Sequence, residues 1–376
     1  MSATLTQSVT DTLDKVGKLK LSGEEASQST PTGQEEKRRA EASGYKYAHL
    51  LPEWHTSLKL PPLEPFEHVD PGHQALKDPA PRSFLEGAAV RDITPNVGTE
   101  VTDGVDLTKL DARARSQLAL FVAQRGVVVF KNQQAFIDSD PRWQIDDWGS
   151  FFGRIHIHPV SGYAKEFPEF HLVWREESGT SDERTYEGRI NNLTVHSDVT
   201  YELQPPGLTT LFLYDSPPTG GDTLFISQTE AYKRLSPSFQ SYLETLEVEH
   251  SGVEQYERAV KLHGADTVKR QPVKHIHPLV RRHPVTGEKA LFVNRGFSRR
   301  IIGLKQEESD AILGLLYDHL ERGHDFSARA RWGEKGTVVL WDNRVTAHSA
   351  LVDWSDGIQG RRHGARITPQ AERPFL

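Results

Sequence analysis

His196 and Asp198 stand two positions apart in the run Val195–Tyr201. In a β-strand, residues i and i+2 point to the same face, so this imidazole and this carboxylate would converge on one point. A second imidazole would complete a set of two histidines and one carboxylate. Such a set holds Fe(II) by one face and leaves other coordination positions open for a 2-oxoacid and O2. The spacing therefore indicates a candidate metal site.

The His-x-Asp pattern is weak evidence when it stands alone. The chain has 17 histidines, and the pairs His156-x-His158 and His275-x-His277 fit a metal site equally well by pattern. The simpler explanation of an isolated His-x-Asp match is a pair of surface residues. The surrounding sequence has to decide between them.

That context is the run Trp341–His348, which follows the apolar residues 337–340. A strand followed by a short exposed turn can present His348 as a third ligand. Further along, Arg362 and Arg366 are four positions apart. A guanidinium near a metal suits a dicarboxylate co-substrate, because its fork matches a carboxylate in geometry and charge. In isolation, two arginines near a C-terminus are more often solvated charges.

The composition limits the chemistry. The 376 residues include no cysteine, which excludes disulfides, thiolate catalysis and cysteine-ligated metals. The net charge of −7 argues against a nucleic-acid partner. Neither a long apolar run nor a signal-like N-terminus is found, so we predict no membrane contact and a cytoplasmic location. The oligomeric state is open, a homo-oligomer included.

The elements that must position these residues are mostly short strands. Apolar spacing predicts a helix that ends at Gly126 and a second helix around residues 312–320. The alternation of strands and helices typical of a parallel sheet is missing. We therefore predict a mainly β protein with flanking helices, built on a barrel or jelly-roll core. The predicted strands are residues 127–130, 208–214, 223–226 and 337–340, the middle two flanking the turn 217–222.

The chain divides by composition into three segments. Residues 1–43 are polar and poor in aromatics, which predicts a flexible N-terminal tail. Residues 44–83 carry prolines and aromatics and are expected to form an extended arm over the domain. Residues 84–376 would form the catalytic domain.

Four sequence blocks together resemble the taurine dioxygenase family in order and spacing. They are His196-x-Asp198, the turn Gly220–Thr223, Trp341–Arg344 ahead of His348, and Arg361–Arg366. The resemblance runs from about Phe84 to Pro369, and residues 198–207 resemble the fungal sulfonate dioxygenase branch. It implies a double-stranded β-helix and an oxygenase that uses Fe(II), 2-oxoglutarate and O2. The implied substrate is a small organosulfonate, oxidised at the carbon bearing sulfur to an aldehyde and sulfite, with succinate and CO2 formed alongside.

The resemblance also implies a role for each matching residue. Iron ligands would be His196, Asp198 and His348, and no catalytic residue beyond the metal centre is implied. Arg362 and Thr223 would hold the distal carboxylate of 2-oxoglutarate. The substrate contacts would be His158, Asn192, Val199 and Arg366. For His158, the alternative is a satisfied buried histidine.

The sequence departs from the bacterial members of the family in the charged run 174–184, which is longer here. A loop at this place is predicted to lie over the pocket as a lid, which argues for a substrate other than taurine. Val195 also stands where many relatives have tryptophan. Three alternatives stay open: the same oxygenase acting on an alkyl sulfate, a carboxylate or a biosynthetic intermediate; a metal-free binding module; and a zinc hydrolase. The last gives Arg362 and Thr223 no role.

Overall fold

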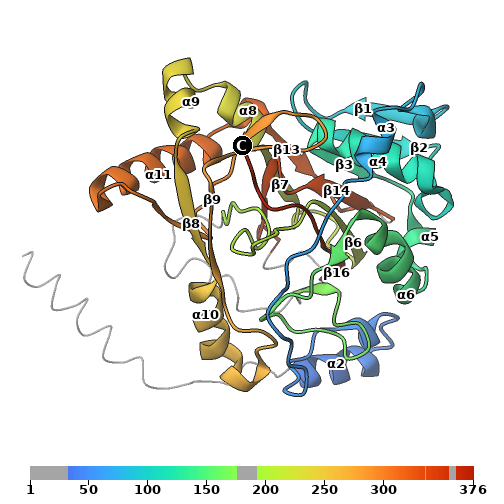
Figure 1. Cartoon of the computed structure of the whole chain (residues 1–376). Coiled ribbons are helices and arrows are strands. Elements are labelled where there is room, and N and C mark those ends of the chain that lie inside the picture. The colour runs from blue at the N-terminus through green and yellow to red at the C-terminus, as the bar shows by residue number, and fades with distance from the viewer. Residues whose placement is uncertain (1–32, 176–192, 335, 355–360) are drawn as a thin grey trace, which may run out of the picture. The chain divides into compact units, whose positions relative to one another are not determined.

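The computed structural model describes residues 33–175, 193–334, 336–354 and 361–376. The chain divides into two units, residues 1–48 and 49–376. In the first unit, helix α2 (Gly33–Ala42) falls within the segment for which a tail is predicted (Figure 1). The second unit contains the predicted site residues that are described. The division into tail, arm and catalytic domain stays a prediction.

A seven-stranded sheet forms the larger layer of the described part of residues 49–376. All its neighbouring strands pair antiparallel except β2 and β3. In spatial order the strands are β1 (Ala89–Asp92), β2 (Thr99–Asp103), β3 (Val127–Phe130), β14 (Val338–Asp342), β6 (Leu208–Asp215), β16 (Arg362–Ile367) and β5 (His171–Arg175). The strands at the centre, β3 and β14, are buried along their whole length, as their uninterrupted apolar residues predict.

A three-stranded sheet packs against this larger one. Its order is β13 (Ser327–Ala330), β7 (Thr223–Ser227) and β15 (Thr346–Ala350). Phe225 and Ala328 from this sheet lie in one apolar cluster with Val129, Leu211 and Val339 from the larger sheet. The two sheets therefore bury their apolar faces against each other, as in a sandwich. Smaller sheets are β12 (Ser298–Ile301), β8 (Glu247–Ser251) and β9 (Lys274–Pro278); β10 (Val280–Arg282) and β11 (Lys289–Leu291); and β17 (Pro369–Gln370) with β4 (Arg154–Ile155).

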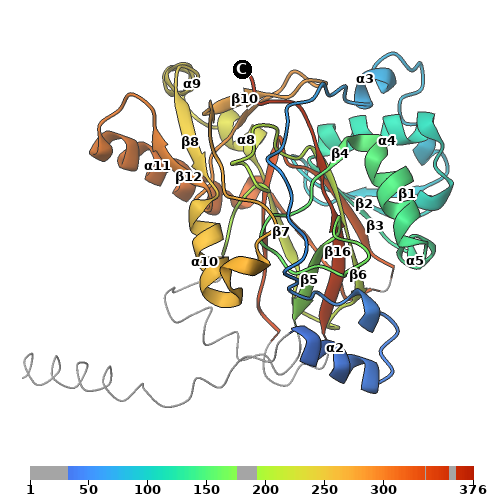
Figure 2. The same ribbon diagram turned by 60° about the horizontal axis from the view of Figure 1, so that its bottom comes forward.

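Helices flank the sheets on two sides. Figures 1 and 2 both show α9, α10 and α11 on one side and α4 and α5 on the other. Helix α4 (Ala112–Arg125) begins where the Asp111 carboxylate accepts a hydrogen bond from Ala114 N at 2.8 Å, and it ends at Gly126, with φ of 74°. The other α-helices are α3 (Gly72–Ala75), α5 (Gln134–Ile137), α6 (Pro141–Trp143), α8 (Gln228–Lys233), α9 (Pro237–Leu243), α10 (Val253–His263) and α11 (Gln306–Glu321).

The sheet-rich fold with flanking helices agrees with the sequence prediction, and both predicted helices and all four predicted strands are present. One arrangement is not a simple hairpin. The strands β6 and β7 flank the predicted turn but belong to different sheets, so the chain crosses from one layer to the other there. Gly220 and Gly221 make this crossing possible, since their φ values of 82° and 68° are strained for other residues. Within the described residues, no helix is long and apolar enough to cross a membrane.

Candidate metal centre and anion-binding residues

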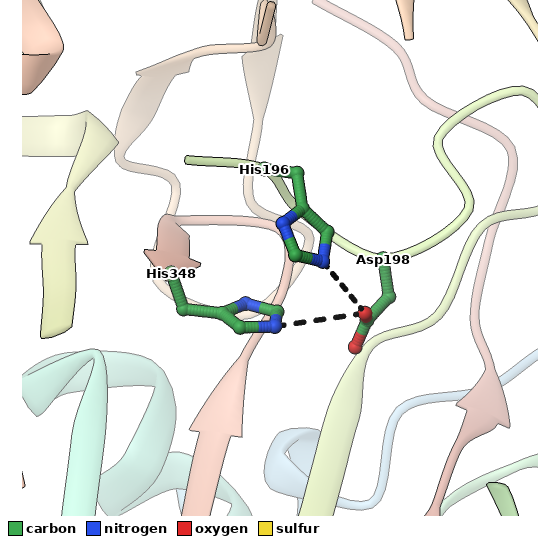
Figure 3. Close-up of side chains that lie close together, drawn as sticks. All are labelled: His196, Asp198 and His348. Atoms are coloured by element: carbon green, nitrogen blue, oxygen red, sulfur yellow. Dashed lines mark ion pairs between the residues drawn. The ribbon is translucent and has the colours of Figure 1, made fainter. Parts of the chain in front are cut away.

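His196, Asp198 and His348 come together at one point of the structure (Figure 3). Their nearest ligand atoms lie within 4.8 Å of one another. Nε2 of His196 is 3.7 Å from Asp198 Oδ1, and Nε2 of His348 is 3.6 Å from the same oxygen. Two imidazole nitrogens and a carboxylate on one side of a point form a donor set that suits Fe(II). Among the described residues, this is the one group of three metal-binding side chains found.

A pair of backbone hydrogen bonds brings the two histidines side by side. His196 N donates to His348 O at 3.0 Å, and His348 N donates to His196 O at 2.7 Å. His348 belongs to β15, whereas His196 forms only an isolated bridge to it. This bridge joins residues that are far apart in the sequence. The proximity of the two imidazoles therefore comes from tertiary pairing and not from one local sequence motif.

The expectation that His196 and Asp198 share a regular strand is wrong. Asp198 begins a turn, and the next residue, Val199, has a φ of 39°. Positive φ is a rare conformation for a β-branched residue, and such strain is found mostly where a site requires it. Val199 is buried beside the predicted metal ligands, so the turn directs the Asp198 carboxylate toward the imidazoles.

The run Trp341–Arg344 holds this turn in place. Asp198 N donates to Asn343 Oδ1 at 3.1 Å, and the same oxygen accepts from Trp341 Nε1 at 3.0 Å. The amide nitrogen of Asn343 donates to Gly207 O and to Thr209 Oγ1. The turn after β14 was expected to be exposed, but residues 341–349 are all buried. Its function in the fold is to fix the carboxylate, and His348 follows in the next strand.

Burial and charge set the protonation of the three groups. Burial lowers the pKa of His348 to about 3, although Asp198 acts in the opposite direction, and burial also lowers the pKa of His196. Burial alone would raise the pKa of Asp198, but Arg366, His348 and His196 together outweigh it and the pKa is lowered. His196 Nδ1 donates to Thr194 O at 2.5 Å, which leaves its Nε2 as a free lone pair. Neutral imidazoles and an ionised carboxylate are the forms that bind a metal.

The buried Oδ2 of Asp198 has no hydrogen-bond partner within the described part of the chain. A buried carboxylate oxygen without a partner costs free energy unless a ligand compensates it. The residues present therefore fit a divalent metal ion at this point.

The other histidine pairs do not form metal sites. His156 Nε2 lies 3.0 Å from Glu202, which also pairs with Arg270. His275 and His277 face the backbone carbonyls of Tyr201 and Glu202. His156, His275 and His277 thus contact protein groups and do not join a metal-binding set among the described residues.

Arg362 and Thr223, the residues predicted to hold 2-oxoglutarate, are neighbours. Arg362 Nε donates to Gly221 O at 3.0 Å, and its Nη2 lies 3.4 Å from Thr223 Oγ1. Thr223 Oγ1 also accepts from Trp332 Nε1 at 3.1 Å, so its hydroxyl hydrogen is free to donate to an anion. Burial lowers the pKa of Arg362 to about 10, which still leaves the group charged at neutral pH. Within the described residues it has no carboxylate in contact.

Arg366 lies between the predicted metal ligand Asp198 and a further imidazole, that of His171. Its Nη1 is 2.8 Å from Asp198 Oδ1, and its Nη2 is 3.1 Å from His171 Nδ1. His158 packs edge to face on His171, with ring centroids 4.5 Å apart. The four predicted substrate contacts therefore divide: His158, Val199 and Arg366 lie at this site, and Asn192 lies outside the described residues, as does most of the predicted lid (176–184). His171 was not found from the sequence, because no local motif marks it.

A second cluster of buried charges lies around Arg344. Its guanidinium contacts Asp342 at 2.6 Å, Asp70 at 2.6 Å and Glu372 at 3.2 Å. His283 Nε2 reaches Asp342 at 3.0 Å. Although burial opposes ionisation, these partners raise the pKa of Arg344 and lower that of Asp342 well beyond their usual ranges. The cluster joins the segment after residue 49, the turn beyond β14 and the C-terminal segment.

Comparison with known proteins identifies the family to which the chain is related. The family model described as "Taurine catabolism dioxygenase TauD, TfdA family" matches residues 89–368. A Saccharomyces cerevisiae protein named alpha-ketoglutarate-dependent sulfonate dioxygenase is 42% identical over 348 residues, covering 92% of this chain and 82% of that protein. The alpha-ketoglutarate-dependent dioxygenase cnsM of Penicillium expansum is 40% identical over 339 residues, covering 89% and 92%. A solved structure of a putative alpha-ketoglutarate-dependent taurine dioxygenase from Burkholderia xenovorans has a TM-score of 0.62 and 29% identity, covering 77% of this chain and 94% of that one.

The fold and the matches define an enzyme of the 2-oxoglutarate-dependent dioxygenase class. The chain belongs to the TauD, TfdA family of taurine catabolism dioxygenases, and the resemblance seen in the sequence is confirmed.

Proposed function

We propose that this protein is an Fe(II)- and 2-oxoglutarate-dependent dioxygenase that hydroxylates an organosulfonate at the carbon bearing sulfur. The hydroxysulfonate would collapse to an aldehyde and sulfite, while 2-oxoglutarate and O2 give succinate and CO2. The two facing sheets would be the double-stranded β-helix of this class. The observation that carries the proposal is the position of Arg366, whose guanidinium adjoins both Asp198 and an imidazole pair. The name of the yeast relative supports the choice of sulfonate.

His196, Asp198 and His348 would hold the iron, which when bound supplies the activation of O2 that the protein's own groups cannot perform. Arg362 would bind the distal carboxylate of 2-oxoglutarate through its guanidinium, with the Thr223 hydroxyl donating one further hydrogen bond. These two residues would thus fix the orientation of the co-substrate.

Arg366 would bind the sulfonate. A sulfonate keeps its negative charge at all physiological pH values and offers three acceptor oxygens, which suits a guanidinium with imidazole donors beside it. Holding this head group orients the adjacent carbon toward the metal centre and gives the regiochemistry of hydroxylation. The backbone of the Val199 turn would line the same space.

The experiment is an anaerobic reconstitution with Fe(II), followed by exposure to O2 with 2-oxoglutarate and a panel of sulfonates, alkyl sulfates and carboxylates. Succinate and sulfite are measured together. We expect sulfonate-dependent succinate with an equal amount of sulfite. Succinate formed only with a sulfate or a carboxylate would contradict the sulfonate assignment and retain the oxygenase.

Arg366→Ala sharpens this test. It should raise the sulfonate KM by about 30-fold or more, because it removes the cation of a buried charge pair, and should leave the 2-oxoglutarate KM nearly unchanged. If the variant instead lowers thermal stability while both KM values stay constant, Arg366 is a structural ion-pair residue and the sulfonate site lies elsewhere.

A further inference from the structure

His171 stands directly opposite Arg366 in the sheet. The two residues are cross-strand partners on β5 and β16, so their side chains leave the same face. Arg366 Nη2 reaches His171 Nδ1 at 3.1 Å. The register of this strand pair therefore adds a histidine to the face that carries the predicted sulfonate-binding arginine.

The contacts of His171 and His158 fix the same tautomer in both rings. A guanidinium can only donate, so His171 Nδ1 accepts from Arg366 and its proton lies on Nε2. His158 Nδ1 accepts from Ser161 N at 3.2 Å and from Val160 N at 3.4 Å, which again leaves the proton on Nε2. Neither Nε2 has a hydrogen-bond partner within the part of the chain that the structure describes. Two N–H donors are thus available on perpendicular rings whose centroids are 4.5 Å apart.

The surroundings of this imidazole pair attract anions. Burial and then Arg366 lower the pKa of His171 well below its usual range, so the ring is a neutral donor at pH 7. The largest electrostatic influences on the ring come from basic side chains: Arg366, His158, Lys269 and His156. Arg366 also contacts the Asp198 carboxylate, but its Nη2 is directed to His171. A cation and two neutral donors close together form an environment for an anion with several acceptor oxygens.

We propose that His171 binds the anionic head group of the substrate directly, as a third donor beside Arg366 and His158, and that it selects a three-oxygen sulfonate over a two-oxygen carboxylate. This inference rests on the proposed function. A tetrahedral sulfonate can place one oxygen against each of the three donors. A planar carboxylate has only two oxygens, so it loses less when one donor is removed.

The test compares binding of 1-butanesulfonate and pentanoate, which share a carbon chain, to the protein loaded with Mn(II) and 2-oxoglutarate under anaerobic conditions. Calorimetry gives each Kd without turnover. His171→Leu should weaken 1-butanesulfonate by ~10- to 100-fold, the usual value of one hydrogen bond to a charged group, and should change pentanoate several-fold less. His171→Gln, which keeps an acceptor for Arg366 and an N–H donor, should recover most of the sulfonate affinity. His324→Leu, at an exposed histidine, is the control and should change neither Kd.

A double-variant cycle separates direct contact from an effect through Arg366. If His171 only holds Arg366 in place, His171→Leu adds no further loss in an Arg366→Gln background, and the inference is overturned. If His171 contacts the anion itself, a further loss of several-fold persists there. Equal loss for sulfonate and carboxylate in His171→Leu would also overturn the selectivity claim.

The result distinguishes this inference from the proposed function. If the unaltered protein binds 1-butanesulfonate and His171→Leu binds it equally well, only the role of His171 is wrong. If the unaltered protein binds no sulfonate, by calorimetry or in the turnover panel, the proposed substrate class is wrong and the inference fails with it.

Discussion

The charges around Arg344 and those around Asp198 are both buried, yet they are compensated to different extents. Arg344, Asp342 and Asp70 have no buried side-chain atom without a hydrogen-bond partner among the described residues. Around Asp198, three buried atoms in the described part of the chain lack a partner: Asp198 Oδ2, His348 Nδ1 and Arg366 Nε.

This difference indicates which cluster stabilises the fold and which one binds a ligand. The ionic groups of Arg344, Asp342 and Asp70 all find partners within the fold, so they can fix the positions of the segments that contribute to them. Next to them, Arg281 contacts Glu372 but leaves Nε and Nη1 without a partner in the described part of the chain. In a cluster with unpaired polar atoms, the buried atoms without hydrogen bonds destabilise the folded protein, and a bound ligand would remove this penalty. We therefore expect changes around Asp198 to affect ligand binding most, and changes around Arg344 to affect stability most.

The largest effect is expected from Asp198→Ala. Turnover should fall to background, because the single carboxylate of the proposed metal set is lost. The melting-temperature increase on adding Mn(II) should disappear as well, since a ligand stabilises only through the site it binds. The measurements are succinate formation and thermal melts with and without metal. Asp325→Ala, at an exposed carboxylate paired with Arg234, is the control and should retain both properties. Normal metal-dependent stabilisation in Asp198→Ala would place the metal elsewhere.

The converse experiment is Arg344→Met. Removing one partner of a buried ionic cluster leaves Asp342 and Asp70 without their arginine, while Glu372 keeps Arg281, and should lower the free energy of unfolding by ~3–5 kcal/mol. Urea unfolding of the metal-free protein measures this. Arg295→Met removes an exposed pair with Asp318 and Glu321 and should cost less than about 1 kcal/mol. Equal costs for the two variants would remove the distinction drawn between the clusters.

Arg362→Ala tests the co-substrate end of the site. Loss of this buried cation should weaken 2-oxoglutarate by about 30-fold or more, equivalent to ~2–5 kcal/mol, and leave the sulfonate KM nearly unchanged. Thr223→Val should have a smaller effect, because it removes one hydrogen bond. Steady-state kinetics with each substrate varied in turn gives both values. An unchanged 2-oxoglutarate KM in Arg362→Ala would reject the assignment.

The same arginine predicts a pH dependence. Its pKa of about 10 means that the guanidinium stays protonated below that pH and loses its charge above it. The carboxylates of 2-oxoglutarate are ionised throughout this range. The contribution of Arg362 to the affinity for 2-oxoglutarate should therefore be constant from about pH 7 to 9.

The smallest effect concerns Lys269, a buried amine that has no carboxylate partner among the residues that the structure describes. Its amine donates to Ser161 O and lies 4.9 Å from the centre of the Tyr163 ring. Burial lowers its pKa from 10.5 to about 7. Between pH 7 and about 10 the unfolded chain therefore binds more protons at this residue than the folded protein does. It follows that this residue makes stability rise with pH in that range.

Lys269→Met should remove that rise. Relative to the variant, the unaltered protein should gain on the order of 1–2 kcal/mol in free energy of unfolding between pH 7 and 9. Urea unfolding at pH 6, 7, 8 and 9 gives the difference, and all other titrating groups cancel because both proteins contain them. A difference that stays constant with pH would mean that Lys269 remains charged in the folded protein.

The candidate metal residues could be predicted because family-specific blocks surround them. His196 and Asp198 are close in the sequence, and His348 follows a recognisable run after a buried strand. The helix end at Gly126 and the buried strand β3 were also readable from local patterns. These features depend on neighbouring residues, which the sequence displays directly.

The features that were missed depend on tertiary pairing. His171 meets Arg366 only because β5 and β16 pair in one register, and no local pattern gives that register. The turn at Val199, where φ is positive, is held by a hydrogen bond from Asp198 N to Asn343, which lies 145 residues beyond Asp198. Arg344 likewise takes two of its partners, Asp70 and Glu372, from segments outside its own turn, so its burial could not be predicted from its neighbours in the sequence.

Strand β16 carries Arg362 and Arg366 on one face, with Gly364 between them. A Cβ at Gly364 would lie 2.3 Å from Phe212 O, so the strand is pressed directly onto its neighbour β6 at that residue. Four residues of strand span about 13 Å, so β16 sets the separation between the Cα atoms of the two proposed anion-binding arginines. A single inserted residue between the arginines would turn one guanidinium to the opposite face. If Arg362 and Arg366 bind as proposed, the distance between the far carboxylate of the co-substrate and the charged end of the substrate would be fixed by this strand, and larger substrates would have to extend away from it.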